Sequence, residues 1–195
     1  KAATPQAPLP PPRRRQRSLK EPRFDVRTPL HQLTGADLSR IDGIGPYNAL
    51  RLISEVGTDM SCWPSENHFT SWLTLAPNNK ISGGRLLSSR TPPSANRAAA
   101  ILRMTAMSIG RTQTALGAFY RRLAYRIGKA KAITATARKI AILVYRTLKG
   151  EIVYQDPGAA AYDARHRQSN VRRLRKHAAT LGFNLVNTQT GEVLA

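Results

Sequence analysis

"DLSRIDGIGPYNALRLI", residues 37–53, carries the strongest local signal in the chain. Thr34 or Asp37 can cap a short first helix, and Pro46 can begin a second one, because its ring fixes φ and its missing N–H is not needed there. The glycine-rich stretch between the two helices predicts a tight turn. The pattern therefore predicts a helix-hairpin-helix, near residues 37–56.

The two glycines of this turn have a chemical use. Gly43 and Gly45 allow a close backbone approach that a side chain would block. The second helix then presents free N–H groups and the positive end of its dipole, which fit a DNA phosphate without reading any base. A plain turn between two packed helices remains the alternative.

Helical periodicity continues outward from this motif, over residues 47–56, 63–76, 95–109, 114–127, 131–148 and 158–182. The expected core positions are Ala49, Leu52, Ile53, Val56, Phe69, Trp72, Leu73, Leu75, Ala98, Ile101, Leu102, Thr105, Ile109, Leu116, Phe119, Leu123, Ile127, Ile133, Ala137, Ile140, Ala141, Val144 and Leu148. The predicted class is all-α: a helix-hairpin-helix followed by a bundle of long helices. Residues 31–183 are expected to form this helical domain, and residues 184–195 a tail that is loose or a small hairpin.

Charge restricts the class of partner. Lys and Arg number 31 against 11 Asp and Glu, which gives a net charge of +20 and a pI near 11.4. Such a chain is typical of proteins that bind nucleic acid. Residues 1–30 combine prolines with Arg13, Arg14, Arg15 and Arg17, so we expect an extended basic arm or linker there. No apolar run is long enough to span a membrane, so no membrane partner is expected.

"NNKISGGRLLSSRTPPSANR", residues 78–97, separates two predicted helices and is expected to be an exposed loop. Gly83 and Gly84 leave Ser82 bendable and accessible. Phosphate-binding candidates in this stretch are Lys80, Arg85, Arg90 and Arg97. A serine hydroxyl is a weak nucleophile unless a base, a metal or a cationic pocket activates it, so the residues alone favour a flexible linker.

Other catalytic groups are scarce. The acidic residues show no two-metal pattern, no Cys/His spacing suits zinc, and the histidines are isolated, so no metal site is expected in this chain. Tyr120 and Tyr125, among arginines, fit either a tyrosine nucleophile or the core edge of an amphipathic helix, and the latter is favoured. The single cysteine, Cys62, excludes an internal disulfide framework.

Five blocks occur together in a characteristic order. They are residues 33–57, "ISGG" at 81–84 followed by Arg85, residues 95–109, residues 115–123 and residues 131–150. In this combination the chain resembles the C-terminal domain of the insertion-sequence 110 family transposases, which are bridge-RNA-guided DNA recombinases. One element departs from the family pattern, because "SSRTPPSANR" holds prolines where many members have Lys-x-Gly; Asn96 and Arg97 still fit.

The resemblance implies an activity and a set of partners. Ser82 aligns with the family's serine, which attacks a DNA phosphate and forms a phosphoserine link. Mg²⁺ is implied only through an RNase H-like acidic domain that precedes this domain in the family. The implied partners are donor and target duplex DNA, a guide (bridge) RNA and further copies of the chain, and the implied location is the bacterial cytoplasm, at the nucleoid.

Since the chain starts at Lys1 without Met, it is expected to be a fragment or a processed product that is inactive alone.

Two alternatives to a recombinase stay open. The chain could instead be a non-catalytic helix-hairpin-helix module in which Ser82 is incidental. A structural basic protein, of the kind found in ribosomes or nucleoids, is the third possibility.

Overall fold

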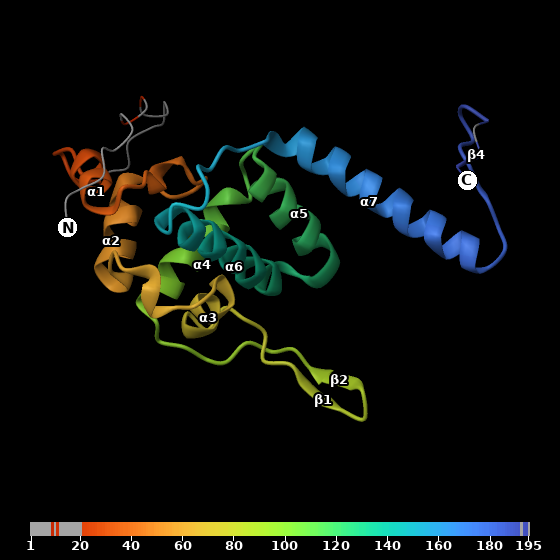
Figure 1. The fold of residues 1–195 in the computed structure, drawn as a ribbon, viewed down its shortest axis with the longest axis horizontal. Helices are drawn as coiled ribbons and strands as arrows, with labels where there is room; N and C mark the ends of the chain where they lie inside the picture. Colours follow the sequence, from red (N-terminus) through yellow and green to blue (C-terminus); the bar gives the residue numbers. More distant parts are fainter. Residues whose placement is uncertain (1–8, 10, 12–20, 192, 195) are drawn as a thin grey trace.

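The computed structural model describes residues 9, 11, 21–191, 193 and 194. In these residues, helices dominate and the strands form two small hairpins (Figure 1). The elements are α1 (Arg27–Thr34), η1 (Leu38–Arg40), α2 (Pro46–Val56), η2 (Met60–Cys62), α3 (Glu66–Trp72), β1 (Lys80–Ser82), β2 (Arg85–Ser88), α4 (Arg97–Ile109), α5 (Ala115–Ile127), α6 (Lys129–Leu148), α7 (Gly158–Thr180), β3 (Leu185–Val186) and β4 (Val193–Leu194), where η marks a 3₁₀ helix. The predicted all-α class is confirmed.

Helix α6 lies at the centre of the bundle and packs against α3, α4 and α5. Ala132, Ala137 and Ala141 are fully buried on it, and such small side chains let neighbouring helices approach closely. Ile140 and Val144 are buried on the same helix and add larger apolar side chains to the core. Helix α4 in turn packs against α2, so the core runs from the glycine turn through α4 to α6.

Helical periodicity predicted most of this core. Every core position expected on α4 is buried. The prediction that Trp72 and Ile127 belong to the core was wrong, because these side chains are 43% and 38% exposed. Phe119 and Leu148 are half-buried. Trp72 still contacts the aromatic cluster with Trp63 and Phe69, at ring-centroid distances of 5.0 and 6.2 Å.

Polar contacts fix α3 against α6. The guanidinium of Arg146 donates two hydrogen bonds of 2.7 Å to the carboxylate of Glu66, and the hydroxyl of Tyr145 donates to the carbonyl of Trp63 at 2.8 Å. The hydrogen bonds from Arg146 hold the pKa of Glu66 below its usual value. These contacts join residues about eighty positions apart in the chain.

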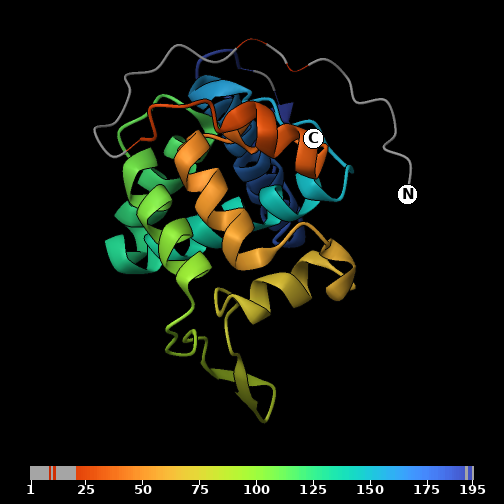
Figure 2. The ribbon, with the colours of Figure 1, turned by 90° about the vertical axis from the view of Figure 1, so that its left-hand side faces the viewer.

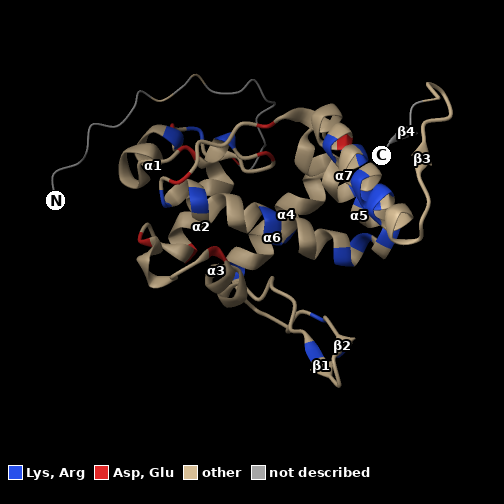
Figure 3. Ribbon diagram, turned by 45° about the vertical axis from the view of Figure 1, so that its right-hand side comes forward, with Lys and Arg blue, Asp and Glu red and all other residues tan. Residues whose placement is uncertain are grey.

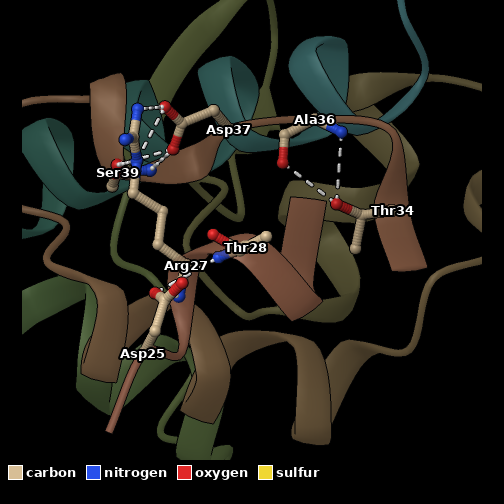
Figure 4. A network of polar contacts seen from close by, with 7 residues as sticks. All are labelled: Asp25, Arg27, Thr28, Thr34, Ala36, Asp37 and Ser39. Atoms are coloured by element: carbon tan, nitrogen blue, oxygen red, sulfur yellow. Dashed lines mark hydrogen bonds and ion pairs between the residues drawn. The ribbon is translucent and has the colours of Figure 1, made fainter. Parts of the chain in front are cut away.

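The N-terminal boundary differs from the expectation. The sequence predicts an arm that ends near residue 30, but α1 begins at Arg27, and Val26 and Leu30 are buried in the core. Arg27 forms a partly buried ion pair with Asp37, and its Nε donates to Ser39 Oγ at 3.1 Å (Figure 4). A contact between residues ten apart therefore adds this helix to the domain. The cations at 13–15 and 17 lie outside the described residues.

The rest of the chain leaves the bundle. Helix α7 extends from it, and β3 and β4 pair antiparallel at its far end, so the tail forms the small hairpin that was one of its two expected states (Figure 1). The β1–β2 hairpin projects separately below α3 (Figure 2). No helix in the described residues is long and apolar enough to cross a membrane.

Candidate nucleic-acid interface

Ser82 lies on a hairpin and not in an irregular loop, which corrects the expectation for residues 78–97. Strands β1 and β2 pair antiparallel, with Ser82 opposite Arg85. Gly83 and Gly84 between them have φ of 54° and 74°. Two successive positive φ values are the mark of the tight turn that best matches strand twist, and glycine adopts them without strain. A Gly-Gly pair between two short apolar runs is itself a hairpin signal.

The hairpin places Ser82 and Arg85 on one face. Cross-strand partners in a sheet point to the same side, and alternate residues of a strand do too, which adds Lys80. All three residues are exposed. Within the described residues, Ser82 has no hydrogen-bond partner for its hydroxyl, so nothing in this part of the chain acts as its base. The serine is presented outward, next to positive charge.

The other face of the hairpin is apolar and equally open. Ile81 pairs with Leu86 across the strands, and Leu87 is the extra residue at a bulge. These side chains are 65%, 54% and 66% exposed. The hairpin therefore has no core of its own, and its shape depends on backbone pairing and on the glycine turn.

Two more of the predicted cations lie near the stem of the hairpin. Lys80 and Arg90 line one open hollow together with Asn78 and Ser88. Arg90 also lines a neighbouring groove of about 850 Å³. The opposite side of that groove comes from α5 and α6, through Phe119, Ile127, Lys131, Arg138 and Lys139. The groove combines an apolar floor with cations and has no acidic lining residue.

Arg97 has a different environment. It is the first residue of α4, and its guanidinium lies 3.5 Å from the carboxylate of Glu55. Its side chain is 81% exposed, so this ion pair leaves most of it open to solvent. Asn96 caps the same helix by accepting a hydrogen bond of 3.0 Å from the N–H of Ala99.

The glycine turn at α2 is built into the core. Ile41 and Ile44 are buried, and Gly43 has φ +80°. A Cβ added to Gly43 would lie 2.7 Å from Ile109 Cγ1 and 2.8 Å from Thr105 Cγ2, so close packing against α4 by itself requires glycine. Gly45 is buried at the N-cap of α2. The first element of the motif is only a 3₁₀ turn, η1, where a short α-helix was expected.

A buried hydrogen bond holds this turn in place. The hydroxyl of Tyr154, after α6, donates to Asp42 Oδ2 at 2.8 Å, and both residues are buried. The start of α2 is thereby fixed, with the N–H groups of its first turn free of intrahelical acceptors. Sequence reasoning missed this pair, since 112 residues separate its members.

Asp37 fixes the segment that precedes the turn, since it contacts both α1 and η1. Burial alone would raise the pKa of its carboxyl, but hydrogen bonds from Arg27 and Ser39 outweigh burial and hold the pKa below its usual value. Its Oδ1 accepts from the N–H of Ser39 at 3.1 Å, which caps η1. Of the two expected caps, Asp37 is therefore the one used; Thr34 bonds to the carbonyls of Leu30 and Ala36.

Two of the arginines near the tyrosines are occupied elsewhere. Arg121 donates to the carbonyls of Gly110 and Thr112, at 3.1 and 2.7 Å, and Arg122 donates to the hydroxyl of Tyr162 at 2.9 Å. These contacts favour a structural role for this stretch. Tyr125 is nevertheless 97% exposed, so placing it at the core edge was wrong.

Metal ligands do not gather in this part of the chain. Among the described residues, no group of three or more His, Cys, Asp or Glu side chains is arranged to hold an ion. The Mg²⁺ implied by the family resemblance does not fit these residues, and no chemical step assigned to them passes through it.

Comparison with protein families gives a match for the central segment of the chain. Residues 35–121 match the model of the Transposase IS116/IS110/IS902 family. The match covers a little less than half of the chain and is consistent with an IS110-family transposase domain. It contains the glycine turn, the Ser82 hairpin, α4 and the first half of α5. The family match indicates a DNA transposase or recombinase function, and with it DNA binding. No curated protein matched the chain.

Proposed function

We propose that this domain supplies the serine nucleophile of a DNA recombinase that a structured guide RNA directs. One observation carries the proposal: Ser82 stands exposed beside a Gly-Gly turn, opposite Arg85, on a hairpin that projects from a transposase domain (Figure 2). A projecting hairpin can reach a DNA strand that the helices do not touch.

The chemistry assigned to this serine is transesterification. Ser82 Oγ attacks a DNA phosphorus, a P–O bond of the strand breaks, and the leaving oxygen takes up a proton while the serine proton passes to a base. Attack by a hydroxyl of another strand reverses these changes and releases the serine, so the phosphodiester is conserved. Arg85 and Lys80, on the same face, stabilise the negative charge that grows on the phosphate oxygens.

The remaining parts of the reaction come from outside the described residues. A base for Ser82 and the Mg²⁺ ligands are provided by an acidic RNase H-like domain, and a second copy of the chain completes the assembly. The target sequence is read by pairing with the guide RNA, so the cations of this domain contact the DNA and RNA backbones and do not recognise bases. The site of action in the cell is nucleoid DNA in the cytoplasm.

The turn at α2 is proposed to bind a backbone phosphate. Gly43 is exposed on the turn that leads into α2, and Gly45 stands at the N-cap of this helix, whose free N–H groups and dipole favour an anion. Since packing against α4 already accounts for glycine at position 43, the contact with phosphate rests on the helix end. Arg90 and Arg97 are proposed as further backbone contacts.

A Ser82→Ala variant tests the proposal. Wild type and variant are combined with the RNase H-like domain, guide RNA, donor DNA and target DNA, and denaturing gels are examined for a protein–DNA adduct. The variant is expected to lose adduct and recombinant product by about a thousandfold or more. Ser89→Ala, an exposed serine near the stem, is the matched control and should react normally.

Adduct and product at the wild-type rate from Ser82→Ala would reject the serine as nucleophile. The alternative function, a non-catalytic nucleic-acid-binding module, predicts a different outcome. Under that alternative the variant binds DNA normally and no adduct forms with either protein.

A further inference from the structure

Helix α7 differs from the other long helices in the described part of the chain. It has 23 residues and none of them is buried. Only its first turns are anchored to the bundle: Tyr162 accepts a hydrogen bond from Arg122 and its ring meets that of Phe119 edge-on, with the centroids 6.2 Å apart. Beyond these contacts, α7 extends into solvent (Figure 1). The side chains of α7 therefore do not belong to the core of this domain.

Positive charge covers this free helix (Figure 3). After Asp163, α7 contains no acidic residue, and six exposed cations follow: Arg165, Arg167, Arg172, Arg173, Arg175 and Lys176. None of them forms an ion pair within the described part of the chain. Like charges so close together destabilise an isolated helix, so an anionic partner is needed to neutralise them.

The cations are ordered around the helix axis. Arg165, Arg172 and Lys176 stand at i, i+7 and i+11, which places them on one side, about 10 and 6 Å apart along the axis. Arg173 is rotated by about 80° from the middle of this row to one flank and Arg175 by about 80° to the other, while Arg167 lies on the opposite side of the helix. The helix thus offers a central row of three cations with one more on each flank.

We infer that α7 is an arm that docks in the major groove of duplex DNA. A helix about 10–12 Å wide fits a groove about 12 Å wide, whose phosphate walls would meet Arg173 and Arg175. The major groove of A-form RNA is too narrow for it. The length of α7, about 34 Å, equals about one turn of the double helix. This inference rests on the proposed function, and it names the form of nucleic acid that this surface binds.

Single-stranded nucleic acid suits the helix less well. Binding of unpaired strands depends on aromatic rings against which bases stack. Between Asp163 and Thr180, α7 contains no Phe, Tyr or Trp. A second copy of the chain is disfavoured too, since it would bring two helices of the same charge together. Duplex DNA is the partner that both charge and shape favour.

The test measures affinity against salt for the 195-residue chain and two variants of equal charge. One variant carries Arg165→Gln, Arg172→Gln and Lys176→Gln. The matched control carries Arg111→Gln, Arg126→Gln and Lys129→Gln, which are exposed cations outside α7 and outside the groove beside the hairpin. Each protein is titrated into 20-base-pair duplex DNA and into duplex RNA of the same sequence, with helicity checked by circular dichroism and mass in solution by light scattering.

For the α7 variant, the slope of log affinity against log salt on DNA should fall by about 0.9 for every phosphate that the variant no longer neutralises. Affinity for DNA should fall at least tenfold, affinity for RNA should change much less, and the control should weaken DNA binding less than threefold. Equal weakening by both variants, an equal loss on RNA, or a change of oligomeric mass in the α7 variant would each overturn the inference. Ser82 is untouched, so adduct formation remains a separate measurement of the proposed function.

Discussion

The glycine turn at α2 and the glycine turn of the Ser82 hairpin use the same residue in opposite settings. Gly43 has φ +80° and lies against Thr105 and Ile109, so its neighbours leave no room for a side chain. Gly83 has φ +54° and no atom within 4 Å of an added Cβ. The first turn is part of the core, while the second is a free tip. Core residues position the turn at α2, whereas backbone geometry alone shapes the turn of the hairpin.

A pair of matched substitutions should separate these settings most strongly. Gly43→Ala is expected to lower the free energy of unfolding by about 3 kcal/mol, since left-handed strain adds to a clash with α4. Gly83→Ala should cost about 1 kcal/mol of strain that stays within the hairpin, so global unfolding hardly changes. Urea denaturation followed by circular dichroism measures both. Equal losses would show that the two turns are not distinct.

The hydroxyl of Tyr154 should matter almost as much to the α2 turn. Tyr154→Phe removes a donor from the buried carboxylate of Asp42 and is expected to cost about 2 kcal/mol. Tyr125→Phe, at a residue 97% exposed, is the matched control and should have no measurable effect. A Tyr154→Phe protein as stable as wild type would mean that this hydrogen bond does not secure the turn.

The Arg27–Asp37 pair gives the same region a dependence on pH. Because the pKa of Asp37 is held below its usual 3.8, its contribution to stability is complete above that pH and is lost as pH falls through the folded-state pKa. Asp37→Asn should cost about 1–2 kcal/mol at pH 7 and flatten the stability profile below about pH 4. Asp163→Asn serves as the exposed control. An unchanged acid profile in Asp37→Asn would contradict the assignment.

The smallest effect is expected on the apolar face of the hairpin. Ile81→Ser with Leu86→Ser should change the free energy of unfolding by no more than about 0.5 kcal/mol, because both side chains are already exposed. Ile140→Ser, at a fully buried position of α6, is the contrasting control and should be severely destabilising. A large loss in the double variant would show that this face packs against the domain.

Sequence patterns succeeded where local periodicity controls the structure. The face of α4 was predicted correctly, since an amphipathic helix against a core repeats its apolar positions. Helix α1 was missed because the pairing of Arg27 with Asp37 and the burial of Leu30 hold it, and neither shows in an eight-residue window. The hairpin was missed although Gly83-Gly84 between short apolar runs signals one. Arg97 could be named as a cation, but its pairing with Glu55 could not be foreseen.

The difference between the two turns bears on catalysis. A nucleophile on a free hairpin can enter a composite site without strain on the core, so its replacement should leave the fold intact. The helix end that we propose to bind a phosphate must instead be rigid, and the contacts of Asp42 and Asp37 supply that rigidity. Stability variants in the α2 turn and activity variants in the hairpin should therefore produce different kinds of loss.

The most direct measurement locates the covalent link itself. The recombination reaction is stopped with denaturant, the protein and DNA are digested, and mass spectrometry identifies the peptide that carries a nucleotide. We predict that the nucleotide is attached to Ser82, that it disappears in Ser82→Ala, and that the variant binds DNA as tightly as wild type. A nucleotide on Tyr120 or Tyr125, or an adduct that persists in Ser82→Ala, would contradict the account.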